Sequence, residues 1–314
     1  MTAKRLVFVT GKGGTGKSSI AAGLAIAAAN SALKVLLIDV EQRHSFGPVF
    51  GFNLVPSKST KVTTVAGSLE ILSLDPTDSL LSYLDKFYGL RIAGGLLTSV
   101  GAVDFATDIA PGLKDILLVG FACDAARQKT NDVYRYDLVI VDAPPTGRIE
   151  KFLTVADTIS AMAPIGPINQ QAQLVRDEVT ATTSQVLIVV NPEELSITEA
   201  LSARYALTSA GIDVGPLIVN QAPDEIAHEF SDEEYESARA HIMSILKNEH
   251  SDADHVLQVV KELHLKHRDA LGLIQELRAD HEVINIPQLD LQSHEFVENE
   301  LVKLLQPLLK ELRK

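Results

Sequence analysis

A glycine-rich segment near the start of the chain constrains the fold more than any other feature. Residues 11–19 read GKGGTGKSS, directly after the apolar run Leu6–Thr10 and at the start of the Ala- and Ile-rich run Lys17–Ser31. This order of strand, glycine loop and helix is the context in which a phosphate-binding loop occurs. The glycines let the backbone curl so that N–H groups point at phosphate oxygens, and the helix N-terminus attracts anions. The segment therefore predicts a nucleotide-binding P-loop.

Individual residues of this loop have distinct expected roles toward ATP. Lys17 is expected to reach the β- and γ-phosphates, and the Ser18 hydroxyl is expected to bind Mg²⁺. Lys12 is a second cation in the loop, which suggests a charge aimed at a nucleotide held by a partner subunit, although a simple surface lysine is the alternative. The residues expected to contact ATP in this segment are Gly11, Gly13, Gly14, Thr15, Gly16, Lys17, Ser18 and Ser19.

Carboxylates at the ends of two further apolar runs complete the candidate site. Asp142 ends the run YDLVIVD and is placed to hold Mg²⁺ through a water molecule, as the second acidic group of a P-loop ATPase. Asp39 and Glu41 alternate, so they face the same side if the strand before them continues. One of the two is expected to orient the attacking water, with a capping or ion-pairing role as the alternative.

Apolar runs alternate with helical patterns along the chain, which predicts an α/β P-loop fold with a mostly parallel central sheet and helices on both faces. Most of the runs are continuously apolar, as strands covered on both faces should be. The predicted strands are Leu6–Thr10, Val35–Asp39, Leu69–Leu74, Leu138–Asp142, Gln185–Asn191, Pro216–Asn220 and Glu282–Ile286.

We expect a single ATPase domain over residues 1–314, with a helical subdomain formed by about 76–130 and 224–280. The first segment is helical but broken by glycines such as Gly94 and Gly112, and the second is long, polar and helical. No internal repeat is visible, so the chain carries one P-loop.

Composition and charge exclude several classes of protein. The formal net charge of −13 argues against a nucleic-acid partner, because binding to phosphate backbones needs clustered Lys and Arg. No apolar run reaches the ~18 residues needed to span a bilayer, and the start shows no cleavable signal pattern. We therefore expect a cytoplasmic protein with at most peripheral membrane association. The single cysteine, Cys123, excludes an intrachain disulfide or a thiolate zinc cage within one chain.

The chain resembles the ArsA family of ATPases, which includes the arsenite-pump ATPase and the factor that targets tail-anchored membrane proteins. The deviant loop at 11–18 carries this resemblance together with DAPPTGRIEKFL at 142–153, which is similar to the family's second switch, and the variant is similar to an ArsA-like branch common in actinobacteria. The resemblance implies that Lys12 reaches across a dimer to the other subunit's nucleotide. It also implies that Asn220 binds adenine and that Pro287 and Gln288 lie near the base.

Departures from the family pattern qualify these expectations. The CxxC pair that binds zinc across the dimer in targeting members falls near Leu257 and Val260 here, so no zinc is expected. The several cysteines and two fused P-loops of the arsenite-pump members are missing, so arsenite activation is not expected. The family pattern DPAHS appears as Glu41–Ser45 (EQRHS), so Glu41 stands where the hydrolytic aspartate would be. A glutamate keeps the carboxylate but moves it by one methylene, which is compatible with slow turnover.

The sequence predicts a Mg-ATP-dependent ATPase that converts ATP to ADP and phosphate and acts as a dimeric nucleotide-driven switch. The dimer could be a homodimer or a heterodimer with a paralogue. Three alternatives stay open: a non-hydrolysing nucleotide-binding partner that regulates an active paralogue, a targeting chaperone for tail-anchored or other membrane proteins with a hydrophobic client, and a small-molecule kinase or synthetase.

Overall fold

An eight-stranded sheet forms the centre of the computed structural model, in the order β10-β9-β8-β1-β7-β2-β4-β3. The structure describes residues 2–41, 54–75, 112–162, 164–223, 250–289 and 294–313, with isolated positions at 46–51 and 233–244. Neighbouring strands run parallel throughout this sheet, except that β3 is antiparallel to β4. The strands are β1 (Leu6–Gly11), β2 (Lys34–Asp39), β3 (Thr60–Val62), β4 (Ser68–Ser73), β7 (Leu138–Asp142), β8 (Ser184–Val190), β9 (Val214–Ala222) and β10 (Val283–Pro287).

The predicted α/β class and all seven predicted strands are confirmed. The sequence did not predict the edge strand β3 or the small antiparallel pair β5 (Lys129–Thr130) and β6 (Val133–Tyr134). These elements are two or three residues long and lie largely at the surface, so they lack the continuous apolar run that marks the central strands.

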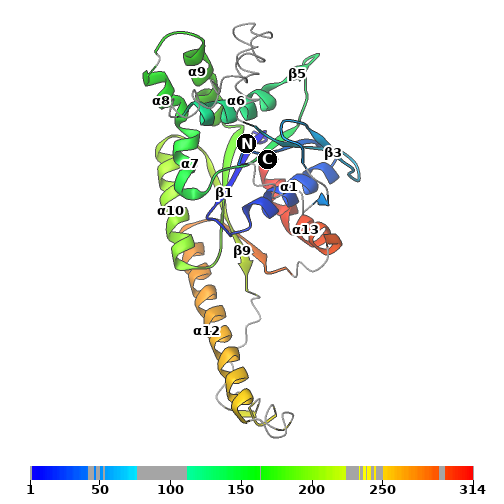
Figure 1. The fold of residues 1–314 in the computed structure, drawn as a ribbon, viewed down its shortest axis with the longest axis vertical. Helices are drawn as coiled ribbons and strands as arrows, with labels where there is room; N and C mark the ends of the chain where they lie inside the picture. Colours follow the sequence, from blue (N-terminus) through cyan, green and yellow to red (C-terminus); the bar gives the residue numbers. More distant parts are fainter. Residues whose placement is uncertain are drawn as a thin grey trace, which may run out of the picture.

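Helices cover both faces of the sheet, and this is why the central strands carry apolar side chains on both faces along most of their length (Figure 1). Along β1, Leu6 and Phe8 join one buried cluster while Val7 and Val9 join the other. Helices α1 (Lys17–Asn30) and α13 (His294–Leu312) cover one face. The other face packs against α6 (Leu113–Arg127), α7 (Thr146–Leu153), α8 (Val155–Met162), α9 (Pro167–Val179), α10 (Glu194–Ser209) and the last turns of α12 (His250–Asp280).

Parts of the predicted helical subdomain lie outside the described residues, namely 76–111 and most of 224–249. Within the first segment, α6 packs on the sheet through buried side chains such as Ile116, Leu118 and Val119. Gly112 adopts a left-handed φ of 88° immediately before α6, so it marks the start of this helix. The subdomain itself stays a prediction.

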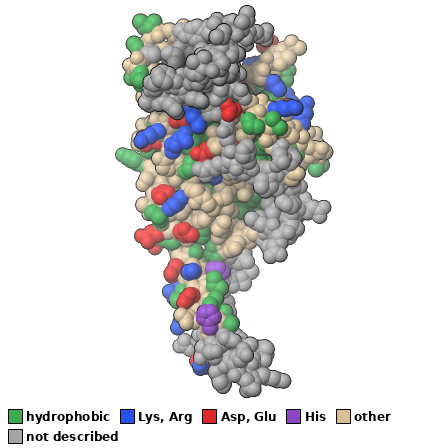
Figure 2. All heavy atoms as spheres, viewed as in Figure 1, with side chains coloured by type: hydrophobic (Ala, Val, Ile, Leu, Met, Phe, Trp, Pro, Cys, Tyr) green, Lys and Arg blue, Asp and Glu red, His purple; other side chains and the backbone are tan. Residues whose placement is uncertain are grey.

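Helix α12 leaves the body of the protein (Figure 1). Ile274 and Leu277, near its C-terminal end, are buried, whereas Val256 and Leu263 are exposed. Figure 2 shows apolar and histidine side chains along this projecting part. Across the ranges given above, no helix combines the length and the hydropathy that crossing a bilayer would require.

Candidate nucleotide-binding site

The loop between β1 and α1 has a backbone that only glycine adopts easily at two positions. Gly14 and Gly16 have left-handed φ angles of 90° and 83°. A Cβ atom at Gly11 would lie 2.4 Å from the Val189 carbonyl oxygen, and one at Gly16 would lie 2.3 Å from Asn220 Nδ2. By contrast, a Cβ at Gly13 would meet no atom within 4 Å among the described residues. The glycines at 11, 14 and 16 are therefore required by the loop's shape and by its close packing on β8 and β9.

Side-chain hydrogen bonds hold the loop in this shape. The Thr15 hydroxyl donates to the Lys12 carbonyl oxygen at 2.9 Å, and Asn220 Nδ2 donates to the Thr15 carbonyl oxygen at 2.9 Å. Asn220 thus lies against the P-loop, at the end of the site that the resemblance assigns to the base. Its predicted contact with adenine stays a prediction.

Ser18 and Asp142 meet at the first turn of α1. The Ser18 hydroxyl donates to Asp142 Oδ2 at 2.6 Å, while Asp142 Oδ1 has no hydrogen-bond partner among the described residues. Asp142 is 5% exposed and Lys17 is 7% exposed. Burial raises the pKa of Asp142 to about 6, with Asp39 and Glu41 adding to the rise, and with Lys17 and the Ser18 hydrogen bond opposing it. This carboxylate is therefore poised to gain from a nearby cation.

Asp39 lies beside Asp142, because the two residues are in register on the parallel strands β2 and β7. Its Oδ1 atom accepts from the Glu41 backbone N–H at 3.0 Å, and its Oδ2 atom accepts from the Ser73 hydroxyl at 3.3 Å. Asp39 thus holds the turn after β2 and links it to β4, and of the two carboxylates it is Glu41 that lies beyond the strand end.

Glu41 forms an ion pair that the sequence did not reveal. Its Oε1 atom lies 3.7 Å from Nη1 of Arg148, and Nη2 of the same guanidinium lies 2.6 Å from Oδ1 of Asp115. Arg148 directly follows the DAPPTG segment, which was a usable signal. Asp115 opens a helix in a different part of the chain, and nothing in its spacing pointed to this contact.

Lys12 is paired within its own chain. Its Nζ atom lies 3.2 Å from Oε1 of Glu199 on α10, and both side chains are about one third exposed, at 34% and 39%. Glu199 had no place among the predicted site residues, because it comes from a helix far along the sequence. The pair would have to open before Lys12 could reach a partner's nucleotide.

Pro287 and Gln288 lie at the same edge of the sheet as Asn220. Pro287 is in register with Ala222 on β9, and the Gln288 backbone N–H donates to the Ala222 carbonyl oxygen at 3.2 Å. The structure therefore brings together, at the carboxyl ends of parallel strands, the residues predicted for phosphate, metal and base. Ligands of open α/β sheets bind at this edge.

The donor set around Asp142 fits Mg²⁺. A hydroxyl and a carboxylate with an unpaired buried oxygen are the hard oxygen ligands that this ion prefers. Within the described ranges, no cluster of three or more His, Cys, Asp or Glu side chains is placed to hold a metal, so the expected ion would rely on the hydroxyl and carboxylate alone. Leu257 and Val260, which stand at the family's zinc positions, lie on α12, and the absence of zinc stays a prediction.

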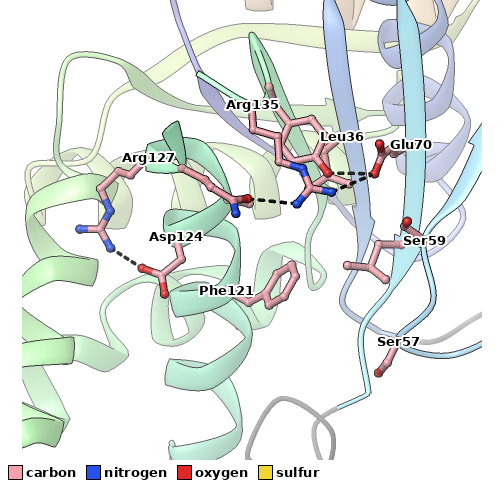
Figure 3. Close-up of a pocket in the computed structure, with 12 residues that line it drawn as sticks. Leu36, Ser57, Ser59, Glu70, Phe121, Asp124, Arg127 and Arg135 are labelled. Atoms are coloured by element: carbon pink, nitrogen blue, oxygen red, sulfur yellow. Dashed lines mark hydrogen bonds and ion pairs between the residues drawn. The ribbon is translucent and has the colours of Figure 1, made fainter. Parts of the chain in front are cut away.

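A separate hollow of about 570 Å³ lies between α6 and β4, away from the P-loop (Figure 3). Its charged side chains are already paired: Arg127 with Asp124, and Arg135 with Glu70. The Tyr136 hydroxyl donates to Glu70 at 2.9 Å, and burial followed by this hydrogen bond raises the pKa of Tyr136 to about 12. Each charged side chain among the described residues that line this hollow therefore has an ion-pair partner.

Comparison with known proteins identifies the family. The family model described as "Anion-transporting ATPase" matches residues 4–177 and 165–275. The chain belongs to the ArsA ATPase family. It is 41% identical over 220 residues to ATPase BagA of Mycobacterium tuberculosis, an alignment that covers 69% of this chain and 65% of the relative.

More distant relatives carry related names. ATPase GET3 of Kluyveromyces lactis is 26% identical over 252 residues, covering 69% of this chain and 72% of that protein. The arsenical pump-driving ATPase of Escherichia coli is 25% identical over 244 residues, covering 68% of this chain and 39% of that protein. All three relatives are named as ATPases, which supports the prediction of an ATP hydrolase. The alignment spans just under two thirds of the length of the mycobacterial relative.

Proposed function

We propose that this ArsA-family protein hydrolyses ATP to ADP and phosphate with Mg²⁺ and works as a dimeric, nucleotide-driven switch. The observation that carries the proposal is the cluster at the start of α1 in which the half-buried Ser18 joins the buried Lys17 and Asp142. A buried lysine beside a glycine-rich loop is suited to bind the β- and γ-phosphates. The cytoplasmic localisation of the protein remains a prediction.

Mg²⁺ would be held by Ser18 directly and by Asp142 through a water molecule. When bound, the ion neutralises charge on the phosphates. The protein contributes the rest: loop N–H groups bind the phosphate oxygens, and Lys17 lies where it can neutralise the terminal phosphates. Glu41 would accept the proton of the attacking water, a role that requires a carboxylate near the strand end. Lys12 would act in trans on the partner's nucleotide, after leaving Glu199.

Two observations favour a second candidate, the non-hydrolysing regulatory partner. Lys12 is engaged by Glu199, and Glu41 is engaged by Arg148. In this state Lys12 is paired inside its own chain and not with a partner's nucleotide, and the Glu41 carboxylate carries an ion pair of its own. The dimer would be a homodimer or a heterodimer with a paralogue.

Steady-state ATP hydrolysis measured against protein concentration tests the proposal. Specific activity should rise with concentration, because Lys12 completes the site of another subunit. Lys12→Ala and Glu41→Gln should each lower kcat by about 100-fold or more. Arg176→Gln is the matched control, since Arg176 pairs with Asp157 at the surface, far from the P-loop. ATP binding without turnover in any variant would instead identify the regulatory partner.

A further inference from the structure

A single guanidinium lies between two carboxylates that come from different parts of the fold. Arg148, in the first turn of α7, is 2.6 Å from Asp115 on α6 and 3.7 Å from Glu41 after β2. The shorter contact is a charge-assisted hydrogen bond, and the longer one is an ion pair without that geometry. Arg148 is therefore fixed mainly by α6 and presents its other nitrogen to Glu41.

The backbone of Arg148 is held rigidly on the side of the nucleotide site. Its N–H donates to the Pro145 carbonyl oxygen at 2.8 Å, and the next residues of α7 anchor the helix through Ile149 and Phe152, both fully buried. The preceding loop is tied to β1, because the Thr10 hydroxyl donates to the Pro144 carbonyl oxygen at 2.6 Å. A change in the loop after Asp142 would consequently move the Arg148 backbone.

The other support, Asp115, belongs to a helix that is part of the core. It lies in the first turn of α6, where the helix dipole favours a negative charge. The next residues, Ile116 and Val119, are buried under the sheet's α6 face. Asp115 thus holds the Arg148 guanidinium from a helix that is not part of the P-loop.

We propose that Arg148 is a positioning residue for hydrolysis: it sets where the Glu41 carboxylate stands, and Asp115 sets where Arg148 stands. The inference rests on the proposed function, because it assigns a consequence to the location of Glu41. The Arg148 side chain is 45% exposed, and ion pairs of this kind are weak enough to open and close within a working cycle. The arrangement links α6 to the reacting end of the nucleotide site.

The test compares Arg148→Gln, Arg148→Lys, Asp115→Asn and the double variant Arg148→Gln/Asp115→Asn, with Arg176→Gln as the control. Arg148→Gln should lower kcat by about 10- to 100-fold, because a misplaced catalytic group loses about this much rate. Equilibrium ATP affinity should change by less than about threefold, since Arg148 touches none of the phosphate-binding residues. Arg148→Lys should recover part of kcat. The double variant should be no worse than Arg148→Gln, because Asp115 acts only through Arg148.

Two results would overturn the inference while leaving the proposed function intact. One is an unchanged kcat in Arg148→Gln when Glu41→Gln is inactive. The other is a parallel loss of kcat, ATP affinity and Tm in Arg148→Gln, which would indicate a purely structural role. Absence of turnover in the wild-type protein, with ATP bound, would instead refute the hydrolytic function, and the positioning role would fall with it.

Discussion

Charged side chains have different surroundings at the two ends of the parallel strands, here called the carboxyl edge and the amino edge of the central sheet. At the carboxyl edge, Asp39, Asp142 and Lys17 are buried close together, and the pKa of Asp142 is raised to about 6. At the amino edge, Lys4 donates to Asp213 at 2.6 Å, and Arg5 donates to the carbonyl oxygens of Ala126 and Tyr136. Charges at the amino edge are matched by their own neighbours. At the carboxyl edge, by contrast, the buried Asp142 keeps one oxygen without a hydrogen-bond partner among the described residues.

Within one sheet, the charged residues at the carboxyl edge therefore serve the candidate site, whereas those at the amino edge serve folding stability. Clustered, desolvated carboxylates cost folding free energy and persist where a site requires them. Paired charges at the opposite edge contribute modest stability. Substitutions at the carboxyl edge should therefore change activity strongly and can raise stability, whereas substitutions at the amino edge should do neither.

The largest effect is expected for Asp142→Asn. It should lower Mg-ATP turnover by about 100-fold or more, because the proposed water-mediated ligand of Mg²⁺ is lost. It should also raise the free energy of unfolding of the nucleotide-free protein at pH 7.5 by about 2 kcal/mol. The folded-state pKa of Asp142 lies above its unfolded value, so its stabilising contribution is complete below pH ~4 and is lost as the pH rises through about 6. Asparagine cannot ionise and avoids this loss.

Urea denaturation at several pH values measures the second part of that prediction. The stability difference between Asp142→Asn and the wild-type protein should shrink toward zero below about pH 3, where the wild-type carboxyl is protonated in both states. Asp157→Asn is a suitable control, because Asp157 is exposed and pairs with Arg176. A variant that is less stable than the wild-type protein at pH 7.5 would contradict the account of the carboxyl edge.

A smaller effect is expected from removing the Lys12–Glu199 ion pair at the carboxyl edge. Glu199→Gln should free Lys12 and tighten ATP-dependent dimerisation by up to about fivefold, the range expected for one partly exposed ion pair. Analytical ultracentrifugation with Mg²⁺ and a non-hydrolysable ATP analogue measures this. The gain should fade at about 0.5 M salt, because screening already weakens the pair in the wild-type protein. If Lys12→Ala/Glu199→Gln dimerises as tightly as Glu199→Gln, the restraint does not act through Lys12.

Local and long-range features of the molecule differ in how well they could be predicted from the sequence. The P-loop and the central strands were predictable, because a glycine spacing and continuous apolar runs are local signals. Lys12 and Glu41 were predicted as site residues, but their partners Glu199 and Arg148 were not, nor was the pairing of Arg148 with Asp115. Those pairs join elements that are distant in the chain, and no local period encodes them. Short surface strands such as β3 were missed for the complementary reason, since three residues with mixed exposure carry almost no pattern.

The smallest effects should come from the amino edge, and they sharpen the comparison most. Lys4→Met should lower the free energy of unfolding by about 0.5 to 1 kcal/mol, because it removes one partly buried ion pair with Asp213 and a hydrogen bond to the Thr182 carbonyl oxygen. Asp213→Asn should cost less, since the side chain can still accept from Gln185 Nε2. Neither variant should change kcat or ATP affinity. Urea denaturation and steady-state kinetics on the same preparations decide the matter. A change in turnover without a matching loss of stability would mean that a substitution at the amino edge affects the site at the carboxyl edge. That result would contradict the separation of stability from function.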